Sequence, residues 1–361
     1  MVKVLVTGGL GFIGSHTTLA LLEAGHSAVI VDDLSNSFPR VFGHLQKLAG
    51  PRAGKMKFVE ADVCDLEKLD AIFEAEKPDA VIHFAGFKAV GESMEQPTKY
   101  YRNNLVSSIN LLDVMPKHGC NMLVFSSSAT VYGIPERVPL TEDCPLSAIN
   151  PYGRTKLFQE DMFRDAAAAD GALRIILLRY FNPVGAHPSG DIGEHPVGVP
   201  NNLMPYVGQV ALGQREFLRV FGDDYDTPDG TAVRDYIHVM DLAEGHVAAL
   251  DKISKTPDYG CQAVNLGTGK GTSVLEMIKA FEKASGAKVP FKIVGRRAGD
   301  APAVWAGTEL AAEMLGWRAT RGLDDMCASL WKWATKYPKG YETPENGVAA
   351  AKEPAVAAAS K

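Results

Sequence analysis

The fold is decided by one stretch near the start of the chain, Thr7-Gly8-Gly9-Leu10-Gly11-Phe12-Ile13-Gly14. It follows an apolar run and opens a segment with helical periodicity, and its glycines have the spacing GxxGxxG. Glycines in such a turn let backbone N–H groups and the helix N-terminus approach a pyrophosphate. We therefore predict a strand, a tight turn and a helix that bind a dinucleotide. The expected cofactor contacts here are Gly8, Gly11, Phe12, Ile13 and Gly14.

Beyond this turn, short β-branched runs alternate with long helical patterns. The strands expected in the first half are Lys3–Thr7, Ala28–Asp32, Lys57–Glu60, Ala80–Phe84, Met122–Ser126 and Leu173–Tyr180. The main helices expected there are Ile13–Ala24, Thr98–Lys117 and Tyr152–Ala169. Nearly continuous apolar strands separated by helices are typical of a parallel sheet covered on both faces. The predicted fold class is α/β, a Rossmann-type doubly wound parallel sheet with a smaller α/β substrate-binding domain.

The pattern changes after Tyr180. Residues 181–201 are rich in Pro and Gly and are expected to form a loop. Helical and strand patterns then return at Leu203–Gly213, Phe217–Phe221, Val239–Asp251, Ala263–Leu266, Val274–Ala284 and Gly322–Tyr337. We predict a dinucleotide-binding domain over 1–181, to which 235–267 returns, and a substrate-binding domain over 182–234 and 268–341. The Ala- and Lys-rich residues 342–361 are expected to be a disordered tail.

Composition excludes several classes of function. The chain has 361 residues, of which 46% are hydrophobic, and a net charge of −6 without a long basic run, which argues against a nucleic-acid partner. Its five cysteines are scattered without a CxxC pair, so neither a disulfide framework nor a metal site is expected. No apolar stretch approaches the roughly 20 residues that span a bilayer, and no signal-peptide pattern is present. We expect a cytoplasmic protein without a membrane partner.

The second and third strands end in carboxylates that suit the adenosine end of a dinucleotide. Asp32-Asp33 lies about 20 residues beyond the glycine turn, where a carboxylate binds the adenine ribose 2′-OH. The same carboxylate would repel a 2′-phosphate, so NAD is predicted over NADP. Asp62-Val63, after the third strand, suits an adenine contact, although an acidic residue there also serves as a helix cap.

A pair of residues with acid–base potential follows, in the run Tyr152-Gly-Arg-Thr-Lys156. Spacing of i and i+4 places the phenol and the ammonium on one face of a helix. We expect the lysine charge and a positive nicotinamide ring to lower the phenol pKa, which is ordinarily about 10. Ser126-Ser127-Ser128 stands at the end of a strand, where ligands bind in open parallel sheets, so Ser128 is expected to share a proton with Tyr152.

Longer motifs show a resemblance to a known family. They are His83–Glu92, Ser126–Gly133, Arg179–Asp191, Pro200–Tyr206 and Val233–Val239. With the glycine turn and the Tyr-x-x-x-Lys run, they resemble the extended short-chain dehydrogenase/reductase family, and within it the UDP-galactose 4-epimerases. The resemblance covers nearly all of residues 2–341. It implies an NAD-dependent isomerase that acts on UDP-sugars and forms a homodimer, through a contact to which the helices 98–117 and 152–169 would contribute.

The resemblance also implies roles for individual residues. Besides the glycine turn, the NAD site would comprise Asp32, Asp33, Asn36, Ser37, Asp62, Val63, Phe84, Ala85, Gly86, Lys88, Asn103, Ser126, Tyr152, Lys156 and Tyr180. The UDP-sugar site would comprise Lys88, Ser128, Tyr152, Phe181, Asn182, Asn202, Leu203, Phe221, Arg234, Arg297, Asp300 and Val304. Phe221 would lie against uracil, the two arginines against the diphosphate, and Asp300 against the uridine ribose. His83 and His238 are interpreted as structural hydrogen-bonding residues.

Three functions remain open from the sequence. The first is C4 epimerisation of UDP-galactose and UDP-glucose through a 4-keto sugar. The second is a nucleotide-sugar 4,6-dehydratase, but similar enzymes of that kind carry an Asp-Glu pair where this chain has Ala129 and Thr130. The third is a non-enzymatic, NAD-responsive protein, which the presence of Ser128, Tyr152 and Lys156 disfavours.

Substrate range depends on one departure from related enzymes. Where bacterial relatives restricted to unsubstituted sugars have Tyr before Trp, this chain has Val304-Trp305. We therefore hypothesise that the smaller side chain leaves room for UDP-GalNAc and UDP-GlcNAc.

Overall fold

The computed structural model describes residues 1–297 and 299–343 of the chain. Its centre is a seven-stranded sheet in which all neighbouring strands are parallel. From edge to edge the strands are β10 (Cys261–Leu266), β6 (Arg174–Tyr180), β5 (Met122–Ser126), β4 (Ala80–His83), β1 (Lys3–Thr7), β2 (Ser27–Asp32) and β3 (Met56–Glu60). The strand order runs outward in both directions from the β1–β4 neighbours, which is the doubly wound order. The predicted fold class is confirmed.

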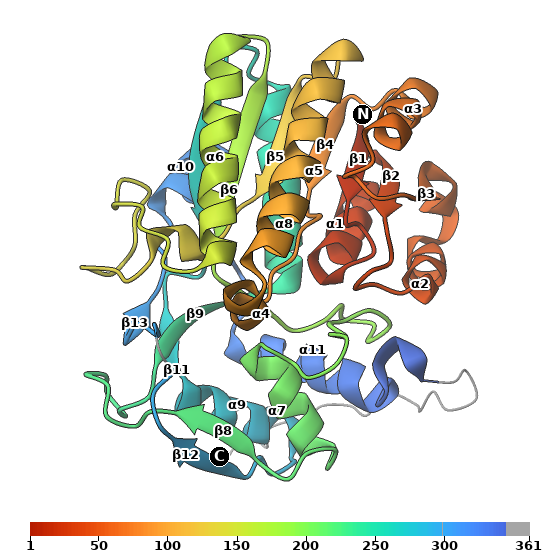
Figure 1. Ribbon diagram of the computed structural model, residues 1–361. Helices are drawn as coiled ribbons and strands as arrows, with labels where there is room; N and C mark the ends of the chain where they lie inside the picture. Colours follow the sequence, from red (N-terminus) through yellow and green to blue (C-terminus); the bar gives the residue numbers. More distant parts are fainter. Residues whose placement is uncertain (298, 344–361) are drawn as a thin grey trace.

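Helices cover both faces of this sheet (Figure 1). Alternate side chains of a strand point to opposite faces, so Val4 and Val6 pack in one buried cluster and Leu5 in another. The first cluster includes residues of α1 (Phe12–Glu23), α2 (Arg40–Ala49) and α8 (Val239–Ser254). The second includes residues of α3 (Leu66–Glu76), α5 (Pro97–Lys117) and α6 (Pro151–Ala169). Burial of both faces explains why the strands read as continuous apolar runs.

A smaller α/β region lies beside one end of the large sheet (Figure 1). In its main sheet, β9 (Val233–His238) pairs with β7 (Asn182–Val184), β11 (Gly271–Ser273) and β13 (Ala303–Val304). A second pair is formed by β8 (Leu218–Phe221) and β12 (Phe291–Val294). The helices of this region are α7 (Leu203–Ala211), α9 (Val274–Ser285) and α11 (Leu323–Lys336). Two further helices lie against the larger region: α4 (Val90–Glu95) contacts α5 and α6, and α10 (Glu309–Leu315) contacts α8 and β10. Short 3-10 turns occupy Gly50–Lys55, Ala129–Tyr132 and Gly340–Glu342.

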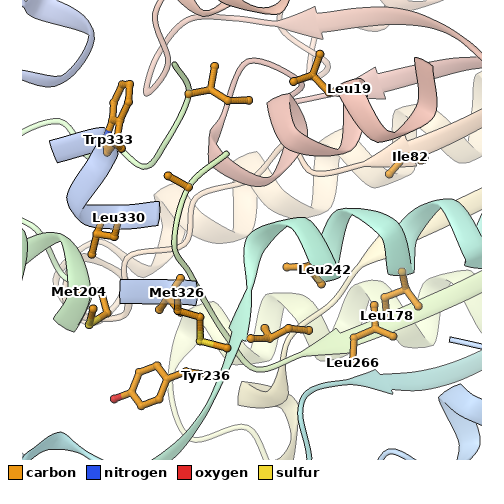
Figure 2. Close-up of a cluster of buried hydrophobic side chains, with 14 of the residues drawn as sticks. Leu19, Ile82, Leu178, Met204, Tyr236, Leu242, Leu266, Met326, Leu330 and Trp333 are labelled. Atoms are coloured by element: carbon orange, nitrogen blue, oxygen red, sulfur yellow. The ribbon is translucent and has the colours of Figure 1, made fainter. Parts of the chain in front are cut away.

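One hydrophobic cluster joins the helices of the two regions. Leu19 of α1 and Leu242 of α8 belong to the same buried cluster as Met326, Leu330 and Trp333 of α11, as Figure 2 shows. Burial of apolar surface is the main favourable term in folding. The smaller region is therefore held against the helix layer of the large sheet by a shared core.

The expectation that residues 181–201 form only a loop is wrong. The segment contains β7, whose residues Asn182–Val184 pair in parallel with Tyr236–His238 of β9. The partner strand lies more than fifty positions away in the sequence, so no local pattern reveals the pairing. The exact boundaries of the two expected domains stay a prediction, with β9 in the smaller sheet and β10 in the larger one.

Two further expectations concern the ends of the fold and its helices. The tail expected over 342–361 lies, from residue 344 onward, outside the described residues, whereas Thr343 is buried. Over the residues that the structure describes, none of the helices combines the length and apolar character needed to cross a membrane.

Candidate active site

The glycine turn packs closely against the neighbouring strand. Gly8 has a φ of +66°, and a Cβ there would lie 2.8 Å from the backbone nitrogen of Ala85. A Cβ at Gly14 would collide with the carbonyl of Gly8, so α1 starts directly against the turn. Gly11 is the N-cap of α1 and offers no side chain to its free N–H groups. These glycines together leave a backbone cradle at a helix N-terminus, the arrangement that binds phosphate oxygens.

The carboxylate of Asp32 stands next to this cradle, at the end of β2. It accepts hydrogen bonds from Leu10 N at 3.0 Å, from Leu34 N at 3.0 Å and from Ser37 Oγ at 2.6 Å. Burial raises the pKa of Asp32, and these hydrogen bonds oppose the rise. The structure thus brings Asp32 and Ser37 together with the glycine turn.

The other residues expected at the adenosine end are more exposed. Asp33 accepts hydrogen bonds from Ser35, and Asn36 beside it is exposed. Asp62 caps the turn that follows β3 by accepting from Cys64 N at 2.8 Å. The side chain of Val63, by contrast, is buried in the core.

Asn104, which sequence reasoning missed, holds the loop after β4 in place. Its amide oxygen accepts from Phe87 N at 2.8 Å, and its amide nitrogen donates to Thr155 Oγ1 at 2.9 Å. The expected cofactor residue Asn103 donates to the same amide oxygen at 3.0 Å. This buried side chain connects the loop that carries Phe84, Ala85, Gly86 and Lys88 to α6. Only its burial on α5 distinguishes Asn104 from an ordinary helix-surface polar residue.

Ser128, Tyr152 and Lys156 meet at the carboxyl end of β5. Their relative exposures are 8%, 7% and 4%, so all three are buried. Ser128 Oγ accepts from Thr130 N at 3.2 Å and from Thr130 Oγ1 at 3.0 Å. Because a hydroxyl has one proton to donate, that proton remains available to the Tyr152 oxygen, and a hydrogen bond from Ser128 lowers the pKa of Tyr152.

The groups around the Tyr152 phenol act on its pKa in opposite directions. Burial raises the pKa of Tyr152 overall, while the Ser128 hydrogen bond and the charge of Lys88 oppose the rise. Lys156 instead donates from Nζ to the carbonyl oxygen of Ser126 at 2.8 Å, and burial lowers its pKa to about 7. Lowering of the phenol pKa by Lys156 together with a bound nicotinamide ring stays a prediction.

The residues expected around the nucleotide also contact one another. Asp300 accepts from Arg297 Nη2 at 2.8 Å and from Arg234 Nη2 at 3.5 Å. The Arg297 guanidinium lies 5.8 Å from the centre of the Phe221 ring, which is 38% exposed. Both guanidinium groups thus contact the Asp300 carboxylate, and Arg297 also lies near the exposed ring of Phe221.

Glu194, whose side chain is 7% exposed, connects a residue expected at the cofactor and the sugar, Lys88, with a residue expected at the UDP-sugar, Asn202. Its Oε1 accepts from Lys88 Nζ at 3.0 Å and from Asn202 Nδ2 at 3.2 Å. The Lys88 side chain is 49% exposed, and the Glu194 carboxylate raises the pKa of Lys88 above its ordinary value against the desolvation of the ammonium. Sequence reasoning did not single out Glu194, which lies within the segment expected to be a loop.

The remaining expected residues flank this centre. Phe181 is buried in a small cluster against which Val304 packs, Asn182 is exposed on β7, and Leu203 begins α7. Burial raises the pKa of Tyr180, and the neighbouring Tyr152 adds to the rise. The end of β6 therefore brings Tyr180 close to Tyr152.

The two histidines are hydrogen-bonded within the protein, as predicted. His83 Nδ1 lies 2.7 Å from Thr7 Oγ1, and its Nε2 lies 3.2 Å from Ser108 Oγ. His238 Nδ1 accepts from Met240 N at 3.1 Å, which caps α8. Burial lowers the pKa of His83 to about 3 and that of His238 to about 4. Both rings are therefore neutral at physiological pH.

A glycine turn, a Ser/Tyr/Lys group at the carboxyl end of β5 and a doubly wound sheet define the class of extended short-chain dehydrogenases/reductases. The family model described as GDP-mannose 4,6 dehydratase matches residues 5–330. UDP-glucose 4-epimerase 2 of Arabidopsis thaliana is 59% identical over 345 residues, which are 96% of this chain and 98% of that relative. The chain belongs to this dehydratase-named family and, within it, to the UDP-glucose 4-epimerases.

Solved structures agree with this assignment. The UDP-glucose 4-epimerase of Bifidobacterium longum, in complex with NAD+ and UDP, is 51% identical with a TM-score of 0.89, over 94% of this chain and 99% of that one. The enzyme of Stenotrophomonas maltophila, with NAD and formylated UDP-arabinopyranose, is 49% identical with a TM-score of 0.89, over 92% and 98%. The resemblance inferred from the sequence motifs is confirmed.

Proposed function

We propose that this chain interconverts UDP-galactose and UDP-glucose by reversible epimerisation at C4, through a 4-keto sugar and with bound NAD. The main support is that the buried Ser128, Tyr152 and Lys156 lie together at the end of β5. They do so in a chain that has a phosphate-binding glycine turn and is 59% identical to a UDP-glucose 4-epimerase. No net oxidation occurs in this reaction, so a retained cofactor suffices.

The fit of NAD rests on the glycine turn and Asp32. Side chains larger than hydrogen at Gly8 or Gly14 would fill the cradle, and α1 directs its free N–H groups toward a pyrophosphate. The Asp32 carboxylate is the natural acceptor for a ribose hydroxyl, and its charge opposes a 2′-phosphate. We expect NAD to bind more tightly than NADP in a titration followed by protein fluorescence. Equal affinities would contradict the role of Asp32.

The protein's own groups would handle the proton of the sugar 4-OH. Tyr152 takes this proton as general base, and Ser128, whose oxygen is already held by Thr130, donates a hydrogen bond at the same place. NAD held by the glycine turn and Asp32 would supply the hydride acceptor and donor for C4. Lys156 fixes the Ser126 carbonyl, and so the end of the strand that carries Ser128. The proton then returns from Tyr152 to the new hydroxyl.

The UDP group would bind on the smaller region. Phe221 offers an exposed ring face to the uracil, and Arg297 and Arg234 offer guanidinium groups to the diphosphate. Asp300, which both arginines now contact, would accept a hydroxyl of the uridine ribose. These contacts hold the nucleotide end in place while the sugar turns at the catalytic end.

Dehydration is the alternative that the family model's name raises. Elimination across C5 and C6 needs an acid and a base beside the sugar. Ala129 cannot transfer a proton, and the hydroxyl of Thr130 already donates to Ser128. We therefore favour epimerisation over dehydration. A 4-keto-6-deoxy product in place of the epimer would reverse this choice.

N-acetylated substrates are a finer proposal that depends on Val304. Its side chain is partly buried and packs against the small cluster of Phe181 and Val131. A tyrosine there would extend farther than valine from the same backbone position. We infer that UDP-GalNAc and UDP-GlcNAc are accepted. Failure to turn over UDP-GalNAc at any enzyme concentration would disprove this.

We further propose that the chain is a homodimer and is located in the cytoplasm. Ile109 of α5 is 45% exposed and Phe158 of α6 is 44% exposed, on two helices that pack side by side. Tyr101 stacks on Phe158 with ring centres 6.1 Å apart, which extends this apolar surface. A monomeric mass by light scattering at micromolar concentration would refute the dimer. The five cysteines, all free thiols, support a reducing compartment.

The deciding experiment adds no cofactor. Purified protein is incubated with UDP-galactose, and the anomeric proton signals are followed by NMR. Formation of UDP-glucose supports both the reaction and the retention of NAD by the protein. No conversion of any UDP-sugar, even after addition of NAD, would contradict the proposed function and favour the non-enzymatic, NAD-responsive alternative.

A further inference from the structure

A fully buried carboxylate, Glu160, lies beneath the catalytic groups. It accepts hydrogen bonds from Arg179 Nη2 at 2.6 Å and from Arg179 Nε at 2.9 Å, so the contact with this guanidinium is bidentate. Ser127 Oγ also donates to it at 2.5 Å. The exposure of Glu160 is 0% and that of Arg179 is 2%. Two charges withdrawn from water in this way are stable only when their hydrogen bonds are satisfied.

Each partner of Glu160 is next to a residue of the proposed reaction. Ser127 precedes Ser128 at the end of β5, and Arg179 precedes Tyr180 at the end of β6. Glu160 itself lies one helical turn after Lys156 on α6. One carboxylate therefore connects the three elements that bring the proposed catalytic residues together.

The far side of Arg179 is also held by buried groups. Its Nη1 donates to Tyr132 Oη at 3.0 Å, and Tyr132 Oη donates to Asn265 Oδ1 at 2.7 Å. Tyr132 ends the 3-10 turn that Ser128 caps, so this chain of hydrogen bonds returns to the same strand end. The Glu160–Arg179 pair thus has little freedom to move away from Ser127.

Lys156 holds the end of β5 through a second contact. Its Nζ donates to the Ser126 carbonyl at 2.8 Å and lies 4.7 Å from the centre of the Phe125 ring. Burial lowers the pKa of Lys156 to about 7, and the charge of Glu160 opposes this. A charged donor makes a stronger hydrogen bond than a neutral amine. The strength of the hydrogen bond from Lys156 to the Ser126 carbonyl therefore depends on the negative charge of Glu160, one helical turn away.

Other titratable groups near these two side chains come from several elements. His83 of β4 faces Lys156 and is held neutral by burial, and Tyr152 precedes Lys156 by one turn. Arg164 of α6 donates to Glu160 from the surface at 2.6 Å, and Cys261 of β10 is close enough to Glu160 for its pKa to be raised by the carboxylate. Of these groups, Glu160 supplies the negative charge at neutral pH.

We propose that Glu160 is a positioning residue for the epimerisation, a proposal that rests on the function proposed above. Its carboxylate holds Ser127, and with it Ser128, against α6, and it provides the negative charge that the buried Lys156 ammonium faces. Loss of the Glu160 charge is therefore expected to change the titration of Lys156, and loss of its contact with Ser127 is expected to displace Ser128.

The test compares wild type with Glu160→Gln, which keeps the shape of the side chain and removes the charge. Lysine labelled with ¹³C at the ε carbon reports the titration of each ammonium by NMR, and the Lys156 signal is identified by its loss in Lys156→Met. We expect the Lys156 midpoint to fall by roughly one pH unit in Glu160→Gln. The alkaline limb of kcat for UDP-galactose should move down with it. An unchanged midpoint would overturn the proposal.

Arg164→Gln is the matched control. It removes a contact of Glu160 on the solvent side but leaves the carboxylate, Arg179 and Ser127 in place. We expect its Lys156 midpoint and kcat to stay close to those of wild type. A shift as large as that of Glu160→Gln would show a general electrostatic effect and contradict the proposal.

Ser127→Ala tests the positioning part even if Glu160→Gln does not fold. It removes one hydrogen bond and keeps the ion pair. We expect kcat to fall roughly tenfold with KM unchanged, because small displacements of reacting groups are costly. Wild-type kcat in a folded Ser127→Ala would overturn the positioning role. If wild type itself converts no UDP-sugar, the proposed function fails, but the Lys156 titration still decides the electrostatic part.

Discussion

The catalytic half and the nucleotide half of the proposed site are built in opposite ways. Ser128, Tyr152 and Lys156 are at most 8% exposed and hydrogen-bonded at the end of β5. The Arg297 side chain is 58% exposed, and Phe221 is 38% exposed. Both halves are in place in the protein alone, but they differ in how strongly they are fixed.

The difference follows from what burial does to charge. Moving a charged group out of water is costly, so the buried groups are held by many contacts made during folding. An exposed ion pair contributes only about 0 to 1 kcal/mol, so Arg297 loses little when it exchanges Asp300 for a diphosphate. A fixed catalytic half and an exchangeable nucleotide half suit a reaction in which the sugar must turn while UDP stays bound.

Tyr152→Phe should have the largest effect on activity. It removes the phenol oxygen and keeps the ring, so packing changes little while the general base is lost. We expect kcat to fall about a thousandfold or more, measured by conversion of UDP-galactose in the NMR assay. NAD content, measured by absorbance after denaturation, separates loss of the base from loss of the cofactor, because Tyr152 is also expected to contact NAD. Turnover at the wild-type rate would show that Tyr152 is not the general base.

Arg297→Ala should act on binding rather than on chemistry. Loss of a guanidinium from the diphosphate is expected to raise KM about thirtyfold, roughly 2 kcal/mol, with a small change in kcat. Arg296→Ala is the control, because Arg296 pairs with Asp224 at 2.7 Å and not with Asp300. If both variants raise KM equally, Arg297 has no specific role in binding the diphosphate.

Val304→Tyr should separate substrates with and without an N-acetyl group. The larger ring is expected to lower kcat/KM for UDP-GalNAc roughly tenfold, with UDP-galactose much less affected. Both substrates are measured with the same enzyme preparation, so misfolding would lower both. A parallel loss would mean that Val304 serves packing with Phe181 and Val131 instead of specificity.

The smallest predicted effect is a dependence of stability on pH. Burial lowers the pKa of His83 to about 3 and of His246 to about 4, from an ordinary value of 6.5. As the pH falls, the unfolded chain therefore takes up these protons before the folded chain does. The contribution of the two histidines to the free energy of unfolding is fully present above pH 6.5 and is lost as the pH is lowered toward 4. Urea unfolding at pH 7.5, 6 and 5 should show this fall. In His83→Gln the slope should be smaller by up to about 1.4 kcal/mol per pH unit, and an unchanged slope would contradict it.

Much of the fold was predictable because its signals are local. The turn at Gly8 to Gly14 and the continuous apolar strands indicate a covered parallel sheet without reference to distant residues. The proposed catalytic residues stand in short motifs at strand and helix ends, so Ser128 and Tyr152 could be predicted to share one site. The strand β7 was missed because its pairing with β9 is set by contacts far along the chain.

The sequence alone determined the class of the protein and the identity of its candidate site residues, since residue types at fixed spacing carry that information. Only the tertiary structure decided their electrostatics. Burial raises the pKa of Tyr152, and the charge that opposes this rise belongs to Lys88. Glu160 accepts hydrogen bonds from both Ser127 and Arg179. Burial and charge proximity depend on chain segments that come together only in the folded protein. Spacing within one helix places Lys156 and Glu160 on one face, but it does not reveal that Ser127 and Arg179 contact Glu160.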